Sequence, residues 1–386
     1  MIVLVGRMRE FGTTVFAEMT ALAVRTGAIN LGQGFPDEDG PPAMLDRAVE
    51  AIRGGLNQYP PGPGVSELRQ AIADHQKVRY GLAYDPDSEI LVTVGATEAI
   101  TASVLALCEP GSEVIVFEPY YDSYPAAIAM AGAVRRAVPL RVEAGRFAFD
   151  PAELRSAVTP KTRAILVNSP HNPTGTVFTP AELAAIAALC REHDLIAITD
   201  EVYEHLTFDD IPHVPLATLP GMRERTVTIS SAGKTFSVTG WKTGWICAAP
   251  ELIRAIQTVK QFLTFTAAAP WQLAVAYALR HELDWVGTLR GALQGKRDRL
   301  MAGLAAAGFE VLRPSGTYFV QTDIRPLGFA DGLDLTRRLP ELAGVVAIPT
   351  QVFYDEPEMG RHYVRFAFCK KDAVIDEAIA RLSRLG

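Results

Sequence analysis

The lysine at position 234 stands in a setting that favours covalent chemistry. It follows the apolar run 226–229, which is typical of a buried strand, and small or hydroxylated side chains surround it. Burial lowers the pKa of a lysine, and the neutral amine is a nucleophile that forms Schiff bases with carbonyl compounds. A surface lysine in an ordinary Ser/Gly/Thr loop would fit the same stretch, so the neighbouring segments must decide.

Further polar residues occur where other apolar runs end. Asp200 follows the run 195–199 directly, and Asn172 lies in the proline-rich loop after the run 164–167. Parallel sheets bind ligands at the carboxyl ends of their strands, so these side chains are candidates for one common site. Asp200 has a simpler alternative role, since an aspartate after a strand is frequently the N-cap of a helix.

The stretch 90–107 combines a buried-strand pattern at 90–94 with a helix that opens on small residues. Ala96 and Thr97 stand in the first turn of this predicted helix. Free N–H groups and the positive end of the helix dipole favour a phosphate there. A plain strand-to-helix turn, which is common in α/β proteins, would explain the same residues.

Aromatic residues are concentrated after the strand-like run 114–117. Three tyrosines, at positions 120, 121 and 124, offer a face on which an aromatic ring can stack, although partial burial at an interface would explain them equally well. Together these segments offer what pyridoxal 5′-phosphate requires: an amine, a carboxylate for its pyridine nitrogen, donors for its phenolic oxygen and a phosphate site. The sequence therefore predicts a pyridoxal phosphate site around Lys234.

The elements that must position these residues alternate between strand and helix patterns from about residue 90 to 250. Such alternation predicts an α/β fold with a mostly parallel sheet and helices on both faces. Residues 7–26 are predicted to be helical, and residues 251–306 to be mostly helical. Strand patterns at 316–320 and 364–368 predict a smaller α+β domain toward the C-terminus.

Composition places the chain among globular proteins with more than one core, because 386 residues with 48% hydrophobic content exceed one typical domain. The net charge of −7, without a basic patch, argues against binding to nucleic acid or to a membrane surface. No apolar run approaches the roughly 20 residues of a membrane span. The four dispersed cysteines and seven histidines follow no metal or disulfide pattern, which predicts no metal and a reducing cytoplasm.

Five motifs resemble those of class I, fold type I, pyridoxal-phosphate-dependent aminotransferases, and the resemblance covers nearly the whole chain. They are Asn-Leu-Gly-Gln-Gly-Phe-Pro-Asp at 30–37, Asn-Gln-Tyr at 57–59, Ser-Pro-His-Asn-Pro-Thr-Gly at 169–175, Asp-Glu-Val-Tyr at 200–203 and Gly-Lys-Thr-Phe-Ser at 233–237. The chain is most similar to the kynurenine, glutamine and methionine aminotransferase branch, and to actinobacterial proteins assigned as N-succinyldiaminopimelate aminotransferases. These motifs are specific for the reaction class and much less so for the substrate.

The resemblance implies a role for each cofactor-site residue. Lys234 would form the Schiff base and move the proton, while Asp200 would pair with the pyridine nitrogen. Asn172 and Tyr203 would donate to the phenolic oxygen, and Tyr121 would lie against the ring. The expected phosphate ligands are Ala96, Thr97, Ser231, Lys242 and, from the second subunit, Tyr59. The expected catalytic residues are accordingly Lys234, Asp200 and Tyr203.

Position 242 departs from a common family pattern, because many relatives have arginine there. Lysine offers only a point charge, so a bidentate grip on the phosphate is lost, although this branch of the family tolerates the change. The implied substrate site centres on Arg365, which would clamp the α-carboxylate through its guanidinium fork. The other expected substrate-binding residues are Gly34, Phe16, Asn172 and, from the neighbouring subunit, Phe265.

The resemblance also implies a homodimer whose active sites are shared across the interface. Three regions are expected in each subunit: an N-terminal arm at 1–38, a large cofactor-binding domain at 39–284 and a small C-terminal domain at 285–386. The expected activity is a ping-pong transamination that moves the amino group of an L-amino acid to a 2-oxo acid. The aromatic rim of the site favours apolar, aromatic, sulfur-containing or glutamine-like amino acids.

Other activities fit the same scaffold. One is an N-succinyldiaminopimelate aminotransferase that uses glutamate and 2-oxoglutarate, although no second arginine can be placed on the distal carboxylate of such a substrate. Another is a cysteine-conjugate β-lyase, since the same carbanion can expel a leaving group. A non-catalytic regulator would carry a DNA-binding segment ahead of this domain, whereas only a short stretch precedes Gly34 and the charge is acidic.

Overall fold

The computed structural model describes residues 3–12 and 14–385 of the chain. The helices are α1 Val15–Thr26, α2 Pro42–Arg53, α3 Ser66–Tyr80, α4 Gly95–Leu107, α5 Ser123–Met130, α6 Pro151–Ser156, α7 Pro180–Glu192, α8 Ala232–Thr235, α9 Pro250–Lys260, α10 Ala269–His281, α11 Leu283–Ala306, α12 Gly332–Ala343, α13 Pro357–Gly360 and α14 Asp372–Leu382. The strands are β1 Ile29–Asn30, β2 Ile90–Thr93, β3 Glu113–Glu118, β4 Val134–Pro139, β5 Arg141–Glu143, β6 Arg146–Ala148, β7 Thr162–Asn168, β8 Ile196–Asp200, β9 Thr226–Ser231, β10 Gly244–Cys247, β11 Glu310–Leu312, β12 Phe319–Asp323, β13 Val345–Val346, β14 Ile348–Pro349 and β15 Tyr363–Ala367.

A seven-stranded sheet forms the centre of the molecule, with the order β2-β10-β9-β8-β7-β3-β4. Only β10 runs antiparallel to its two neighbours, and the other adjacent pairs are parallel. Strands such as β2 and β8 are buried at every position, as expected where helices cover both faces of a parallel sheet. The predicted α/β fold with a mostly parallel sheet is therefore confirmed.

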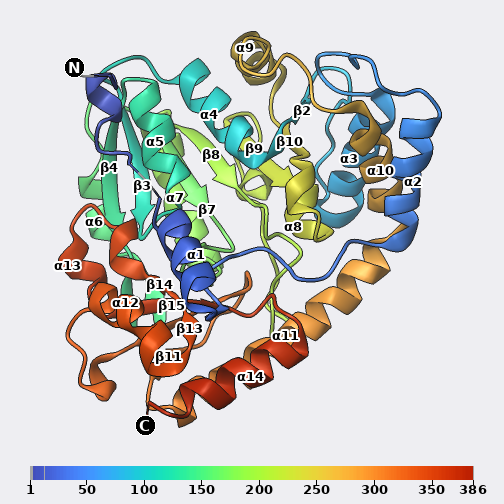
Figure 1. Cartoon of the computed structure of the whole chain (residues 1–386). Coiled ribbons are helices and arrows are strands. Elements are labelled where there is room, and N and C mark those ends of the chain that lie inside the picture. The colour runs from blue at the N-terminus through green and yellow to red at the C-terminus, as the bar shows by residue number, and fades with distance from the viewer. Residues whose placement is uncertain (1–2, 13, 386) are drawn as a thin grey trace.

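Helices cover both faces of this sheet (Figure 1). The helices α4, α5 and α9 pack on one face, against apolar side chains that include Ile198, Val227 and Ile229. The opposite face is covered by α2, α3 and α10 near β10, and by α7 near β7. Blue α2 and α3 lie beside gold α10 in Figure 1, although about 200 residues separate them in the chain.

A second region contains an antiparallel sheet of order β11-β12-β15-β14, with α12, α14 and part of the long helix α11 packed on it. The N-terminal helix α1 joins this region, so blue and red segments lie together in Figure 1. Strand β1 pairs in parallel with β13, and the N–H of Leu31 donates to the carbonyl of Val346 at 2.9 Å. We keep the three-part division at 38 and 284 as a proposal, which the start of α11 at Leu283 supports.

Two sequence expectations about element bounds are wrong. The predicted helix over 7–26 begins only at Val15, because Thr14 is its N-cap and accepts a hydrogen bond from the N–H of Ala17. The predicted strand at 316–320 starts only at Phe319, because Thr317 has a positive φ of 68° that ends any extended run before it. In the described part of the chain, no helix has the length and apolar character to cross a membrane.

Candidate active site

A cavity of about 200 Å³ opens between the central sheet and the second region. It lies where β2, β7, β8 and β9 end, since its walls include residues at or just beyond their carboxyl ends. Twelve of the fourteen expected site residues line it: Phe16, Gly34, Ala96, Thr97, Tyr121, Asn172, Asp200, Tyr203, Ser231, Lys234, Lys242 and Arg365. Segments that are remote in the sequence therefore converge on one space.

The two remaining residues, Tyr59 and Phe265, lie outside the walls of this cavity. Their side chains are 81% and 54% exposed, and the two rings contact each other edge-on with centroids 5.2 Å apart. Both were expected to act across a subunit interface, and a single chain leaves that expectation as a prediction.

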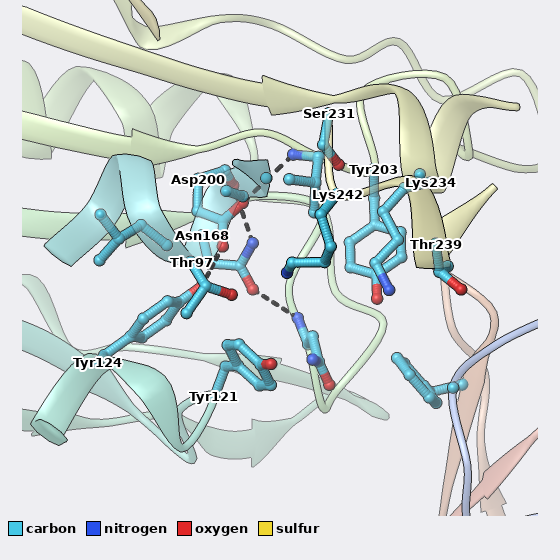
Figure 2. Close-up of a pocket in the computed structure, with 18 of the residues that line it drawn as sticks. Thr97, Tyr121, Tyr124, Asn168, Asp200, Tyr203, Ser231, Lys234, Thr239 and Lys242 are labelled. Carbon is cyan, nitrogen blue, oxygen red and sulfur yellow. Dashed lines mark hydrogen bonds between the residues drawn. The ribbon is translucent and has the colours of Figure 1, made fainter. Parts of the chain in front are cut away.

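Lys234 projects into the cavity from α8, the single helical turn that follows β9 (Figure 2). Gly233 allows this turn to approach the chain closely, since a Cβ there would lie 3.1 Å from the Cα of Thr239. Burial lowers the pKa of Lys234 to about 8, although Cys369 and Asp200 act in the opposite direction. Lys234 is therefore not a surface lysine in an ordinary loop. Its buried amine has the lowered pKa that nucleophilic chemistry requires.

Asp200 is the last residue of β8, and its carboxylate is buried beside α5. The hydroxyl of Tyr124 donates to Asp200 Oδ2 at 2.6 Å, and Asn168 Nδ2 donates to the Asp200 carbonyl at 2.8 Å. Burial raises the pKa of Asp200, while the Tyr124 hydrogen bond, the Val202 N–H and the charge of Lys234 oppose that shift. The helix N-cap alternative fails, because the described residues after Asp200 form a turn rather than a helix.

The first turn of α4 forms an anion-binding corner of the cavity. Gly95 has a φ of +73°, and a Cβ at that position would lie 3.0 Å from Lys242 Nζ. The ammonium of Lys242 thus lies directly against the helix N-terminus, where backbone N–H groups and the helix dipole favour an anion. Thr97 and Ser231 add hydroxyl groups to the same cavity, as Figure 2 shows. The corner has the chemistry of a phosphate site.

Arg365 forms a second anion site at the opposite side, on β15 of the second region. The side chain is 1% exposed, and its Nη1 and Nη2 groups donate to Asn172 Oδ1 and to the carbonyl of Gly32, both at 2.9 Å. Its Nε atom is buried without a partner. The guanidinium also lies 4.0 Å from the ring centroid of Phe319. Burial lowers the pKa of Arg365 to about 10, so the group stays cationic at neutral pH.

The three clustered tyrosines have different positions. Tyr121 and Tyr124 both line the cavity, with ring centroids 5.8 Å apart in an edge-on arrangement. Tyr120 points elsewhere, and its hydroxyl donates to Asp355. Tyr203 is buried on the other side of the cavity, where burial raises the pKa of its hydroxyl. The tyrosine cluster thus supplies two wall residues, and Tyr120 is buried in the core of the chain.

Several wall residues were not predicted as site residues. They are Gln33, Gly95, Ile100, Tyr124, Asn168, Val202, Gly233, Thr239, Thr243 and Phe319. Tyr124 and Asn168 belong to segments that the sequence had already marked as candidates. Asn168 directly follows the strand-like run 164–167, and this position could have identified it as a site residue. Phe319 offered no such signal, because its place in the cavity depends on how the second region packs against the sheet.

The donor set fits pyridoxal phosphate. A buried amine, a buried carboxylate that hydrogen-bonds already hold in place, and a helix N-terminus with an adjacent ammonium lie around one space. Asn172 Oδ1 is occupied by Arg365, which leaves its Nδ2 group as a donor for the phenolic oxygen. The unpartnered Nε of Arg365 fits a further acceptor, such as a substrate carboxylate.

Comparisons with known proteins agree with this chemistry. The family described as "Aminotransferase class I and II" matches residues 26–382. A protein named probable N-succinyldiaminopimelate aminotransferase, from Mycobacterium tuberculosis, is 56% identical over 389 residues, which covers 99% of this chain and 98% of that protein. A methionine aminotransferase of Escherichia coli is 40% identical over 381 residues and covers 98% of each chain.

Solved structures agree with these sequence comparisons. The structure of N-succinyldiaminopimelate aminotransferase from Mycobacterium tuberculosis superposes with a TM-score of 0.98 at 56% identity and covers 100% of both chains. A mutant aspartate aminotransferase from Thermus thermophilus superposes with a TM-score of 0.92 at 34% identity, again over 100% of both chains. The fold is therefore that of fold type I aminotransferases.

Proposed function

The chain is a member of the class I and II aminotransferases, and from this premise we propose that it moves an amino group from an L-amino acid to a 2-oxo acid with pyridoxal phosphate at Lys234. The observation that carries the proposal is the buried Lys234 amine, whose pKa burial lowers to about 8, in one cavity with Asp200 and Arg365. When bound, pyridoxal phosphate supplies an electron sink for negative charge at the substrate Cα.

Arg365 binds and orients the substrate. Its guanidinium offers a fork that matches a carboxylate, and the aromatic faces of Phe319 and Phe16 lie 4.0 Å and 5.3 Å from it. These rings exclude water from one side, which strengthens the contact with the substrate α-carboxylate. The Cα–H bond is thereby held in the cavity that also contains the Lys234 amine.

Lys234 moves the proton. Its neutral amine would accept the proton from the substrate Cα, and the resulting ammonium would release that proton to the cofactor carbon C4′, so the protein gains no net proton. In its ionised form, Asp200 would stabilise a cationic ring nitrogen, and the hydroxyl of Tyr124 fixes that carboxylate. The remaining contacts of the cofactor are assigned to Asn172 and Tyr203 for the phenolic oxygen, to Tyr121 for the ring, and to Ala96, Thr97, Ser231 and Lys242 for the phosphate.

For the substrate, we favour apolar, aromatic, sulfur-containing or glutamine-like amino acids. Phe16, Tyr121 and Phe319 form the aromatic wall of the cavity, and Lys234, Lys242 and Arg365 are the only cations among the described wall residues. A second candidate is N-succinyldiaminopimelate, since a relative named for that activity is 56% identical over nearly the whole chain. Its distal carboxylate would require a cation from outside the described walls.

We also infer a homodimer that completes the site. Tyr59, Phe262, Leu263 and Phe265 form an exposed apolar patch, with exposed fractions of 81%, 84%, 45% and 54%. An apolar patch of this kind is typical of a surface that a partner covers. Light scattering at micromolar concentration should give twice the 41.8 kDa mass of the chain, and a persistent monomer would contradict the shared site.

A donor screen tests the function and ranks the substrates. The purified protein, loaded with pyridoxal phosphate, is mixed with each amino acid and with N-succinyldiaminopimelate, and the absorbance of the bound cofactor is followed. We expect at least one donor to convert the bound cofactor. If no donor converts it, the transamination proposal is wrong. Product analysis with a sulfur-conjugated cysteine separates transamination from β-elimination. Lys234→Ala should abolish turnover, while the exposed Lys77→Ala serves as the matched control.

A further inference from the structure

Tyr318 joins the reactive lysine to the segment that covers the substrate. It stands just before β12, is 1% exposed, and its ring meets that of Tyr203 edge-on at 5.2 Å. Its hydroxyl has a partner on each side: Lys234 Nζ lies 3.0 Å away, and the carbonyl oxygen of Gly34 lies 2.6 Å away. No role in the chemistry above has been given to this residue.

The direction of both hydrogen bonds follows from their chemistry. A backbone carbonyl only accepts, so the proton of the Tyr318 hydroxyl must point to Gly34. The Tyr318 oxygen then accepts, and an N–H of Lys234 donates to it. Burial raises the pKa of Tyr318 well above its usual value, so the hydroxyl keeps its proton throughout the working pH range. Tyr318 therefore exchanges no proton with Lys234 and can act only by position.

This contact determines where the amine points. Tyr318 is the only hydrogen-bond partner that the described residues give to Lys234 Nζ. Behind the lysine, Ser237 and Cys369 line a small cavity of about 10 Å³, which is too small for more than one water. One N–H is thus directed toward Tyr318, which leaves the second N–H and the lone pair of the neutral amine on the side of the larger cavity.

Gly34 is fixed in turn by the second region. Its carbonyl can reach Tyr318 because the residue lacks a side chain, since a Cβ would lie 2.4 Å from the ring of Phe319. Two residues earlier, the carbonyl of Gly32 accepts from Arg365 at 2.9 Å. The same short segment therefore contacts the carboxylate clamp at one point and, through Tyr318, the reactive amine at another.

We propose that Tyr318 is a positioning residue that holds the Lys234 amine toward the substrate and couples its orientation to the Gly34 segment, which Arg365 also contacts. Substrate binding at Arg365 then stabilises the arrangement in which the lysine lone pair faces the substrate Cα. This inference rests on the proposed role of Lys234.

The kinetic test is Tyr318→Phe in the protein loaded with pyridoxal phosphate. The ring and its packing are kept, and the hydroxyl is lost both as the acceptor from Lys234 and as the donor to the Gly34 carbonyl. We expect kcat to fall about ten- to hundredfold, as for a misplaced reacting group, with KM changed far less. The kinetic isotope effect with an α-deuterated amino acid should rise, because proton transfer becomes slower than the other steps.

A second readout does not depend on turnover. In the apoprotein, the reaction of Lys234 with an amine-labelling reagent is followed against pH by peptide mass spectrometry. An acceptor favours the charged amine, so Tyr318→Phe should lower the pKa of Lys234 further below about 8. The control is Tyr84→Phe, a buried tyrosine remote from the cavity, which should change neither kcat nor the labelling pKa.

The possible outcomes separate the proposals. If Lys234→Ala is inactive while Tyr318→Phe keeps the wild-type kcat and labelling pKa, the positioning role is refuted and the function stands. If Lys234→Ala retains turnover, the proposed function itself fails. Should Tyr318→Phe not fold, 3-fluorotyrosine at position 318 keeps the hydroxyl but weakens it as an acceptor. A smaller decrease of the Lys234 pKa is then expected, and an unchanged pKa contradicts the proposal.

Discussion

Two buried polar clusters lie on opposite faces of the same chain segments. Neighbouring residues point to opposite sides: Asp200, Tyr203 and Ser231 line the active-site cavity, whereas Glu201, Glu204 and Ser230 belong to the other cluster. Along β9 this divergence follows from the alternation of side chains in a strand. The second cluster is completed by His75 and Tyr80 of α3 and by His205 and His213.

The second cluster resembles a site at first sight. His75, Glu204 and His205 each bring a possible metal-ligand atom within 4.8 Å of the others. These atoms already interact with one another or with hydroxyl groups. The two Nε2 atoms of His75 and His205 are 3.1 Å apart, and Glu204 accepts from Tyr80 at 2.7 Å and from Ser230.

The difference teaches what marks a functional site in this protein. In the active-site cavity, buried charged groups face an open space, and the Arg365 Nε has no partner. In the second cluster, His75 Nδ1 and His213 Nδ1 also lack partners, but neither residue lines the active-site cavity, the small cavity beside Lys234 or the surface cavity at Arg191. Burial of polar groups is common to both regions, and only the space for a ligand distinguishes them.

The sharpest test of this comparison exchanges acid for amide in each cluster. Asp200→Asn should lower kcat/KM by roughly a thousandfold or more, because the charge that stabilises the cofactor ring is lost. Glu204→Gln should keep activity per folded molecule within a fewfold of wild type but lose about 1–3 kcal/mol of stability, since it disturbs a buried hydrogen-bonded anion. Steady-state kinetics and urea unfolding measure the two effects. Equal losses of activity in both variants would break the comparison.

Arg365→Lys is expected to have the next largest effect. A lysine keeps the positive charge but loses the fork and its stacking on Phe319, so KM for the amino acid should rise about a hundredfold. The control is the conservative change Arg299→Lys in the second region, where Arg299 forms an exposed ion pair with Asp372. A KM unchanged by Arg365→Lys would place the carboxylate site elsewhere.

The pH dependence of cofactor uptake should reveal the buried lysine. Burial lowers the pKa of Lys234 to about 8, and the neutral form above that pKa is the nucleophile. The rate at which the apoprotein binds pyridoxal phosphate should therefore rise as the pH increases through about 8 and then level off. Stopped-flow absorbance between pH 6 and 10 measures it, and a rate that still rises in proportion to hydroxide above pH 9 would indicate an unperturbed lysine.

The histidines of the second cluster predict an effect on stability rather than on catalysis. Burial lowers the pKa of His205 to about 3, so the folded state disfavours the proton that the unfolded chain accepts below about 6.5. Stability should thus be lost as the pH falls below 6.5, and His205→Gln should reduce the slope of that loss by up to about 1.4 kcal/mol per pH unit. Urea midpoints from pH 7 to 4.5 measure it, and parallel slopes in both proteins would contradict this assignment.

Zinc addition is expected to have the smallest effect. Because the Nε2 atoms of His75 and His205 already share a hydrogen bond, excess Zn²⁺ should shift the melting temperature of the apoprotein by less than about 1 °C. A stabilisation that is lost in His75→Gln would show that the second cluster binds a ligand after all, and the comparison would fail.

Local patterns were enough to predict which strand ends contribute residues to the cavity. Lys234, Asp200 and Asn172 occur where apolar runs end, and the structure brings all three into one cavity. The same reasoning led to the proposed phosphate corner at Ala96 and Thr97, since a strand followed by a helix that opens on small residues is a local pattern. The sheet followed from the alternation of strands and helices.

Contacts between remote segments escaped prediction. The hydrogen bonds from Tyr124 to Asp200 and from Lys234 to Tyr318 join residues 76 and 84 positions apart, and no periodicity encodes such pairs. The start of α1 was predicted too early. The helical spacing of apolar residues continues before Thr14, but Thr14 caps the helix and so sets its first turn. The role of the second region in completing the site came only from the resemblance.

The pairing of β1 with β13 has a consequence for how the protein is made. Gly32 and Arg365 are 333 positions apart, and the Ala367 N–H donates to the Leu31 carbonyl at 2.7 Å. The ribosome releases the N-terminus first, yet that segment finds its partners only when nearly all of the chain has emerged. The central sheet can form during synthesis, whereas the carboxylate clamp and the Tyr318 contact are assembled last. Nascent chains halted before residue 345 should therefore contain Lys234 but lack a closed active site.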